Sequence, residues 1–70
     1  MEDIELAVWI ETRRREINKV INALAENADP KKLPIFKKAI TVNNSLVELF
    51  WELMIYREKS GLKPIAHPHG

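Results

Sequence analysis

The 70-residue chain has no cysteine and little glycine, with two residues of that type. The absence of cysteine excludes disulfides and thiolate metal sites. A chain of this size commonly needs such a staple, because ordering it costs about 1.5 kcal/mol per residue, or ~105 kcal/mol in all. We therefore expect association with another chain to supply part of the stability.

The sequence also lacks long uncharged runs and a large net charge. No uncharged stretch reaches the ~18 residues of a membrane helix, and the N-terminus has neither the basic region nor the small-residue cleavage site of a signal peptide. The formal net charge of +1 is too small to attract the whole molecule to nucleic acid or to an anionic membrane. With 46% hydrophobic and 30% charged residues, the composition predicts a folded cytoplasmic chain that does not enter a membrane.

Signals of catalysis and of bound cofactors are missing as well. There is no glycine-rich phosphate loop, no nucleophile paired with a base and no zinc-ligand spacing. Glu48 and Glu52 stand four residues apart, as paired carboxylates in bundle enzymes do, but that pattern also needs a Glu-x-x-His. His67 and His69 lie in a proline-containing segment without further ligands. We expect a noncatalytic protein without metal or cofactor.

Residues 2–27 contain neither glycine nor proline, and their apolar residues recur at spacings of three and four. This period predicts one face of a long helix. The face consists of Ala7, Ile10, Arg14, Ile17, Ile21, Leu24 and Ala28. Arg14 is its polar member, and we expect its stem to pack while its head reaches water or an acid. Residues 4, 6, 8 and 10 also alternate, so a short N-terminal strand is the competing interpretation.

A connection is expected at residues 28–34, because two prolines four residues apart do not both fit inside a helix. The second helix should begin near Pro30 or Pro34 and end at Ser60-Gly61, where glycine can adopt the left-handed conformation of a helix C-cap. Its main stripe comprises Ile35, Ala39, Val42, Leu46, Leu49, Leu53 and Tyr56, and an adjacent stripe comprises Phe36, Ile40, Asn43, Val47, Phe50 and Met54. Residues 41–45 are poor helix formers, so a kink or a new helix start there is the alternative to one continuous helix.

Two helices joined by a short connection predict an all-α antiparallel hairpin over residues 1–61, followed by an extended, proline-containing tail over residues 62–70. Folding about the connection places Leu24 near Ile35 and Phe36, Ile17 near Val42 and Asn43, Ile10 near Leu49 and Phe50, and Trp9 near Trp51. Asn43 would then be a lone amide in an apolar seam, where it selects the register of the assembly. In a helix break it would serve a turn instead.

The apolar surface of the second helix exceeds what one neighbouring helix can cover. Between Leu46 and Tyr56, nine of eleven residues are apolar. A helix that is apolar on nearly all sides must be buried on nearly all sides. We therefore expect a homodimeric four-helix bundle, with an oligomer or partner interface made by Trp9, Leu46, Val47, Phe50, Trp51, Met54 and Ile55. This architecture is similar to that of small dimeric helical-hairpin adaptors such as the RNA-binding Rop protein, a likeness of fold alone.

These surfaces suggest two functions. The first is a noncatalytic protein–protein interaction module, a small homo-oligomeric adaptor or an accessory subunit of a larger assembly. The alternative is a small dimeric regulator that binds nucleic acid through Arg13, Arg15, Lys19, Lys31, Lys32, Lys37 and Lys38. Three successive arginines fan over about 200° of a helix, however, so they do not all face one ligand. Glu11 also stands four residues before Arg15, the favourable order for a helical ion pair.

Overall fold

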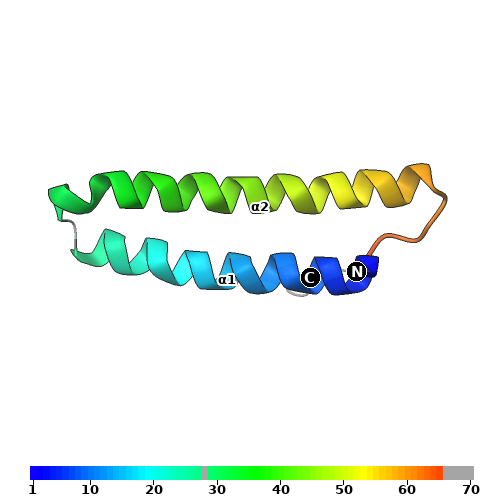
Figure 1. Cartoon of the computed structure of the whole chain (residues 1–70), viewed down its shortest axis with the longest axis horizontal. Coiled ribbons are helices and arrows are strands. Elements are labelled where there is room, and N and C mark those ends of the chain that lie inside the picture. The colour runs from blue at the N-terminus through cyan, green and yellow to red at the C-terminus, as the bar shows by residue number, and fades with distance from the viewer. Residues whose placement is uncertain (28, 66–70) are drawn as a thin grey trace.

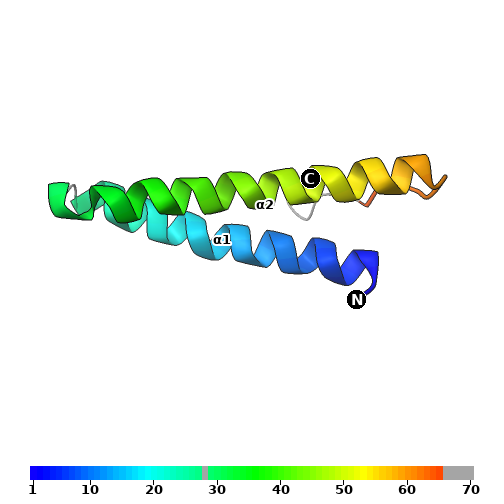
Figure 2. The same ribbon diagram turned by 45° about the horizontal axis from the view of Figure 1, so that its top comes forward.

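The computed structural model describes residues 1–27 and 29–65. Helix α1 (Asp3–Asn27) and helix α2 (Leu33–Lys59) lie side by side and antiparallel, joined by the short 3₁₀ helix η1 (Pro30–Lys32) (Figure 1). The turned view shows the two helices crossing at a shallow angle (Figure 2). No strand occurs in the described residues, so the all-helical hairpin is confirmed and the alternative of an N-terminal strand is wrong. Ala28 and residues 66–70 of the expected tail lie outside the described part.

The connection is short because an aspartate and two prolines fix its backbone. Oδ1 of Asp29 accepts a hydrogen bond from the backbone N–H of Lys31 at 3.0 Å, and Pro30 occupies the start of η1. Pro34 lies in the first turn of α2, where a helix has no internal partner for a backbone N–H. Both expected starting points are therefore used, Pro30 by the 3₁₀ turn and Pro34 by the α-helix.

Helix α2 runs without interruption through residues 41–45, so the alternative of a kink or a new helix start is wrong (Figure 1). The hydroxyl of Thr41 donates to the carbonyl oxygen of Lys37 at 3.1 Å, which satisfies this side chain within the helix. The poor helix formers cost only about 0.5 kcal/mol each. Buried Ala39 and Leu46 on either side of the segment hold the helix against α1, and this packing outweighs the low propensity.

The end of α2 follows the sequence prediction. Gly61 has a φ of +71°, in the left-handed region that side chains disfavour. Its N–H donates to the carbonyl oxygen of Glu58 at 3.1 Å, and the N–H of Leu62 donates to that of Arg57 at 2.8 Å. These two bonds form a Schellman motif, after which the chain turns toward the start of α1 (Figure 1).

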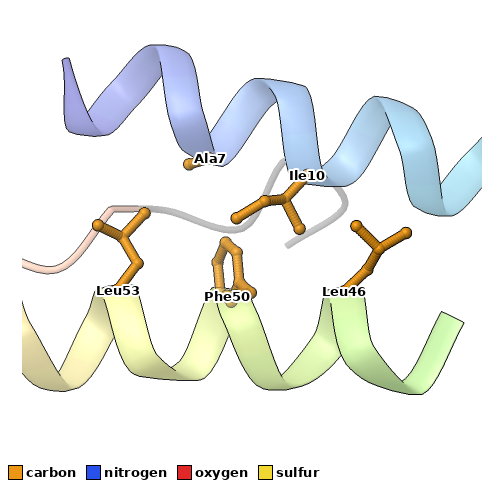
Figure 3. Close-up of a cluster of buried hydrophobic side chains, with 5 residues drawn as sticks. All are labelled: Ala7, Ile10, Leu46, Phe50 and Leu53. Atoms are coloured by element: carbon orange, nitrogen blue, oxygen red, sulfur yellow. The ribbon is translucent and has the colours of Figure 1, made fainter. Parts of the chain in front are cut away.

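One layer of side chains fills the seam between the helices. Ala7 and Ile10 of α1 meet Leu46, Phe50 and Leu53 of α2 in a buried cluster (Figure 3). The predicted proximity of Ile10 and Phe50 is thus confirmed. Partly exposed side chains packed around this cluster are Leu6, Ile17, Met54 and Ile65. The hairpin measures 47 × 20 × 18 Å, so it is an elongated rod, and outside the seam its helices face solvent.

Candidate interaction surface

Residues seven positions apart on α2 stand in rows, because seven residues make nearly two helical turns. The two rows of the seam contain Phe36, Asn43, Phe50 and Arg57 in one and Ala39, Leu46 and Leu53 in the other. The rows that flank the seam are apolar too. On one side lies the open row, which we define as Ile35, Val42, Leu49 and Tyr56, and on the other lies the tail row, which we define as Ile40, Val47 and Met54. Apart from Asn43 and Arg57, helix α2 is therefore apolar over four adjacent rows.

The open row is exposed along its whole length. Its four side chains have exposed fractions of 55%, 40%, 41% and 57% in chain order. Beside this row, Trp9 and Val20 of α1 are 42% and 44% exposed. The predicted proximity of Ile17 and Val42 is found here, because both line a shallow hollow between the helices with Arg13 and Val20. We call this side of the hairpin, made by the open row and the adjoining flank of α1, the open face.

The tail row, on the other side of the seam, is partly covered by the chain itself. After Gly61 the chain turns back, and Ile65 packs against the buried cluster. A groove on this side is lined by Pro64, Ile65 and Arg14 together with Val47, Trp51 and Met54 of α2. The two flanks of α2 thus differ. Val47 and Met54 of the tail row are partly buried beside Pro64 and Ile65, although Ile40 is 37% exposed, whereas no residue of the segment described after Gly61 lies over the open row.

The structure distributes the residues expected at the interface over several places. Leu46 and Phe50 are buried in the seam, so they hold the hairpin itself together. Val47, Trp51 and Met54 line the tail-row groove. The rings of Phe50 and Trp51 meet edge to face, with their centroids 6.4 Å apart. The remaining two, Ile55 and Trp9, are exposed on α2 and α1 respectively.

Trp9 lies apart from the other expected interface residues. The guanidinium carbon of Arg13 is 5.7 Å from the centroid of its ring, a cation–π arrangement on the flank of α1. Trp51 lines the groove on the other side of the seam, so the predicted proximity of the two tryptophans is wrong. Trp9 precedes the seam residue Ile10, whereas Trp51 follows the seam residue Phe50. The turn of ~100° per residue therefore carries the two rings to opposite flanks.

The seven basic residues expected to contact nucleic acid do not form one patch. Arg13 forms an ion pair with Glu16, with Nη1 2.6 Å from Oε2. Arg15 and Lys19 are exposed on α1, whereas the exposed side chains at the loop end are Lys31, Lys32, Lys37 and Lys38. Within residues 1–27 and 29–65, none of these four lysines forms an ion pair with an acid. The structure thus places these four lysines at the loop end and leaves Arg13, Arg15 and Lys19 on α1.

Glu11 is buried beside the seam, with 2% of its surface exposed. Nη1 of Arg14 donates to its Oε1 at 3.1 Å, so the expectation that Arg14 reaches an acid is confirmed. The structure pairs Glu11 with this arginine, whereas Arg15 is exposed. A carboxylate out of contact with water needs a charged or hydrogen-bonding partner, and Arg14 is the arginine nearer the seam.

An ion pair that the sequence analysis missed fastens the end of the hairpin opposite the loop. Nη1 of Arg57 lies 2.8 Å from Oδ2 of Asp3, and its Nε donates to the backbone carbonyl of Lys63 at 2.9 Å. One guanidinium therefore joins the start of α1, the end of α2 and the segment that follows. The sequence contained a signal for this ion pair. Asp3 stands seven residues before Ile10 and Arg57 stands seven residues after Phe50, so both lie in rows that face the seam.

Asn43 lies within continuous helix, in the seam row between Phe36 and Phe50. Its side chain is partly buried, and Oδ1 is buried without a hydrogen-bond partner among the residues that the structure describes. A buried carbonyl oxygen of this kind destabilises the fold, because it gives up hydration without a replacement bond. The amide is thus a polar interruption of the apolar seam, and no turn is present at this position for it to serve.

The described residues hold no group of three or more His, Cys, Asp or Glu side chains that could bind a metal ion. Glu48 and Glu52 are exposed, and His67 and His69 lie outside the described part. Neither of the described α-helices is long and apolar enough to cross a membrane. Comparisons with protein-family models, curated proteins and solved structures found no match. A proposal about function therefore depends on the surface itself.

Proposed function

We propose that the chain is a noncatalytic protein–protein interaction module. In this proposal the hairpin pairs with a second copy into a four-helix bundle and works in the cytoplasm as a small adaptor or as an accessory subunit of a larger assembly. The observation that carries the proposal is the open row, whose four apolar side chains are 40–57% exposed along α2. A helix that packs on a single neighbour usually carries charged residues beside its seam. Apolar residues there are typical of a helix that contacts more than one neighbour.

The total exposed surface supports an association of this size. The chain exposes 5437 Å², whereas the scaling for compact monomers gives about 4500 Å² for 8.1 kDa. The excess of about 900 Å² is close to the ~800 Å² that each partner buries in a standard interface. The radius of gyration is likewise 14.7 Å, against about 11 Å for a compact domain of this length. A second hairpin laid along the first would remove the excess.

Sedimentation equilibrium of the full chain at micromolar concentration tests this proposal. We expect a species of twice 8.1 kDa. We also expect a Tm that rises with protein concentration, because dimer formation stabilises the folded state by mass action. A well-folded monomer whose Tm does not depend on concentration would contradict the proposal.

One observation favours nucleic-acid binding as a second candidate function. The four exposed lysines at the loop end have no acidic partner among the described residues, so they are free to contact phosphates. Binding of this kind weakens steeply with salt, because each phosphate contact releases counterions. A salt titration against duplex and single-stranded nucleic acid distinguishes the candidates. An interaction module should show no binding at low salt, whereas salt-sensitive binding that Lys31→Gln and Lys32→Gln reduce would favour the regulator.

A further inference from the structure

The contacts between the helices show which residues of α1 and α2 lie at the same level along the long axis of the hairpin. Asp3 and Arg57 form an ion pair, and Ile10 and Phe50 meet in the core. In each of these pairs the two residue numbers add to 60. The point between residues 45 and 46 of α2 is therefore level with the point between residues 14 and 15 of α1.

The open row is symmetric about this level. Ile35 and Tyr56 lie equally far from the point between residues 45 and 46, and so do Val42 and Leu49. A second α2 laid antiparallel across the row would place Val42 against Leu49 of the second copy. The same placement brings Ile35 against Tyr56 of the second copy. This reciprocal exchange of residues is what a two-fold axis requires, and every contact of the row joins two apolar side chains.

The flank of α1 on the open face is symmetric about the same level. Trp9 and Val20 lie equally far from the point between residues 14 and 15, and so do Arg13 and Glu16. One axis therefore brings Trp9 to Val20 of the second copy and Arg13 to Glu16 of the second copy. The first contact is apolar and the second joins opposite charges. Arg13 and Glu16 already form an ion pair within the chain, so the axis would create a network of four charges.

Two charges at the outer edge of the open row, Lys38 and Glu52, distinguish an antiparallel from a parallel arrangement. Lys38 and Glu52 are both exposed there and lie equally far from Ser45, which is also exposed. An antiparallel second copy would set Lys38 opposite Glu52 of the second copy. A parallel copy would set each charge opposite its own kind, which disfavours association.

We infer that the open face binds a second copy of the chain, antiparallel, about a two-fold axis that passes near Ser45 and between residues 14 and 15. The tail row is a poorer site for this partner, because Pro64 and Ile65 already cover part of it. The exposed surface of the chain exceeds that of a compact monomer by about 900 Å², which is enough for the ~800 Å² that each partner of a stable dimer buries. The inference rests on the proposed function and adds the face, the orientation and the contacting residues.

Single introduced cysteines can report this geometry, because the chain has none of its own. Asn44 and Ser45 are adjacent and exposed, with Ser45 beside the open row and Asn44 beside the tail row. With a short thiol cross-linker, Ser45→Cys should give covalent dimers and Asn44→Cys should not. A mixture of Ile35→Cys and Tyr56→Cys chains should link to each other in preference to themselves. Self-linking of Ile35→Cys would show a parallel arrangement and overturn the inference.

A charge placed in the open row tests the same face by affinity. Leu49 and Ile55 are each 41% exposed, so their replacement by lysine changes the isolated hairpin to a similar degree. Leu49→Lys should weaken the dimer by about 100-fold or more, because it buries an unpaired charge, whereas Ile55→Lys should not. Circular dichroism checks that both variants keep their helices. A wild-type chain that stays monomeric would refute the proposed function as well, whereas a dimer that tolerates Leu49→Lys and links through Asn44→Cys would refute this inference alone.

Discussion

Replacing Asn43 by leucine should stabilise the protein, because the amide interrupts an apolar seam. Its side chain is partly buried, and Oδ1 has no hydrogen-bond partner among the described residues. An unsatisfied buried acceptor costs about 1–3 kcal/mol. Leucine removes this cost and adds apolar contact in the row that also contains Phe36 and Phe50.

The expected increase in the free energy of unfolding is therefore about 1–3 kcal/mol. In a domain of this size, 1 kcal/mol shifts Tm by roughly 4–8 °C, so Tm should rise by about 4–24 °C. A uniformly apolar seam also specifies the alignment of helices less strictly than a seam that contains a polar residue. Asn43→Leu should consequently permit mixed oligomeric states.

Thermal melts followed by circular dichroism at several protein concentrations, together with sedimentation, measure both effects. Asn44→Leu is the matched control, since this neighbouring amide is exposed and its loss should change stability by less than about 0.5 kcal/mol. A lower Tm of Asn43→Leu with an unchanged oligomer would refute the reasoning, because the amide would then be making a stabilising hydrogen bond.

Three further substitutions test other parts of the hairpin. Phe50→Ala should lower the free energy of unfolding by about 3–5 kcal/mol, measured in urea, because it empties the centre of the core; a similar loss for Trp51→Ala, whose side chain is 61% exposed, would show that the helix is rotated differently. Gly61→Ala should lower the free energy of unfolding by about 1 kcal/mol, because alanine is strained at a φ of +71°. No atom lies within 4 Å of an added Cβ, so no clash adds to this strain, and an unchanged Tm would argue against the left-handed cap. A double-mutant cycle of Asp3→Asn and Arg57→Gln should give a coupling energy of about 0.5–1 kcal/mol that falls at high salt, and a coupling of zero at low salt would mean that the ion pair does not hold the ends together.

The period of the apolar residues was sufficient to predict the two helices and their pairing. Spacings of three and four define one face of each helix, and the prolines and Gly61 mark their ends, because these residues act on the local backbone. The proximity of Ile10 and Phe50 followed from folding the two faces together. Contacts on the flanks were harder to predict, as the error for Trp9 and Trp51 shows. A side chain one position before a seam residue and a side chain one position after it lie on opposite flanks, because each residue turns the helix by ~100°.

The remaining features depend on packing that local patterns do not encode. Residues 41–45 have low helix propensity, yet burial of Ala39 and Leu46 keeps α2 continuous. Glu11 could pair with an arginine three or four residues later, and its burial selects Arg14. The segment after Gly61 has no periodicity, so the sequence could not show which apolar flank of α2 it would cover.

The pairing of Arg57 with Asp3 places the start of α1 and the end of α2 at the same end of the hairpin (Figure 1). In the antiparallel dimer proposed above, the two copies would carry these ends at opposite poles, about 40 Å apart, because the end of α2 at Lys59 lies ~20 Å from the axis at 1.5 Å per residue. Any partner that recognises one pole would find a second, identical pole at a fixed spacing. Binding at one pole would then raise the effective concentration of a linked partner at the other, so a bivalent target of matching length would bind much more tightly than either of its halves.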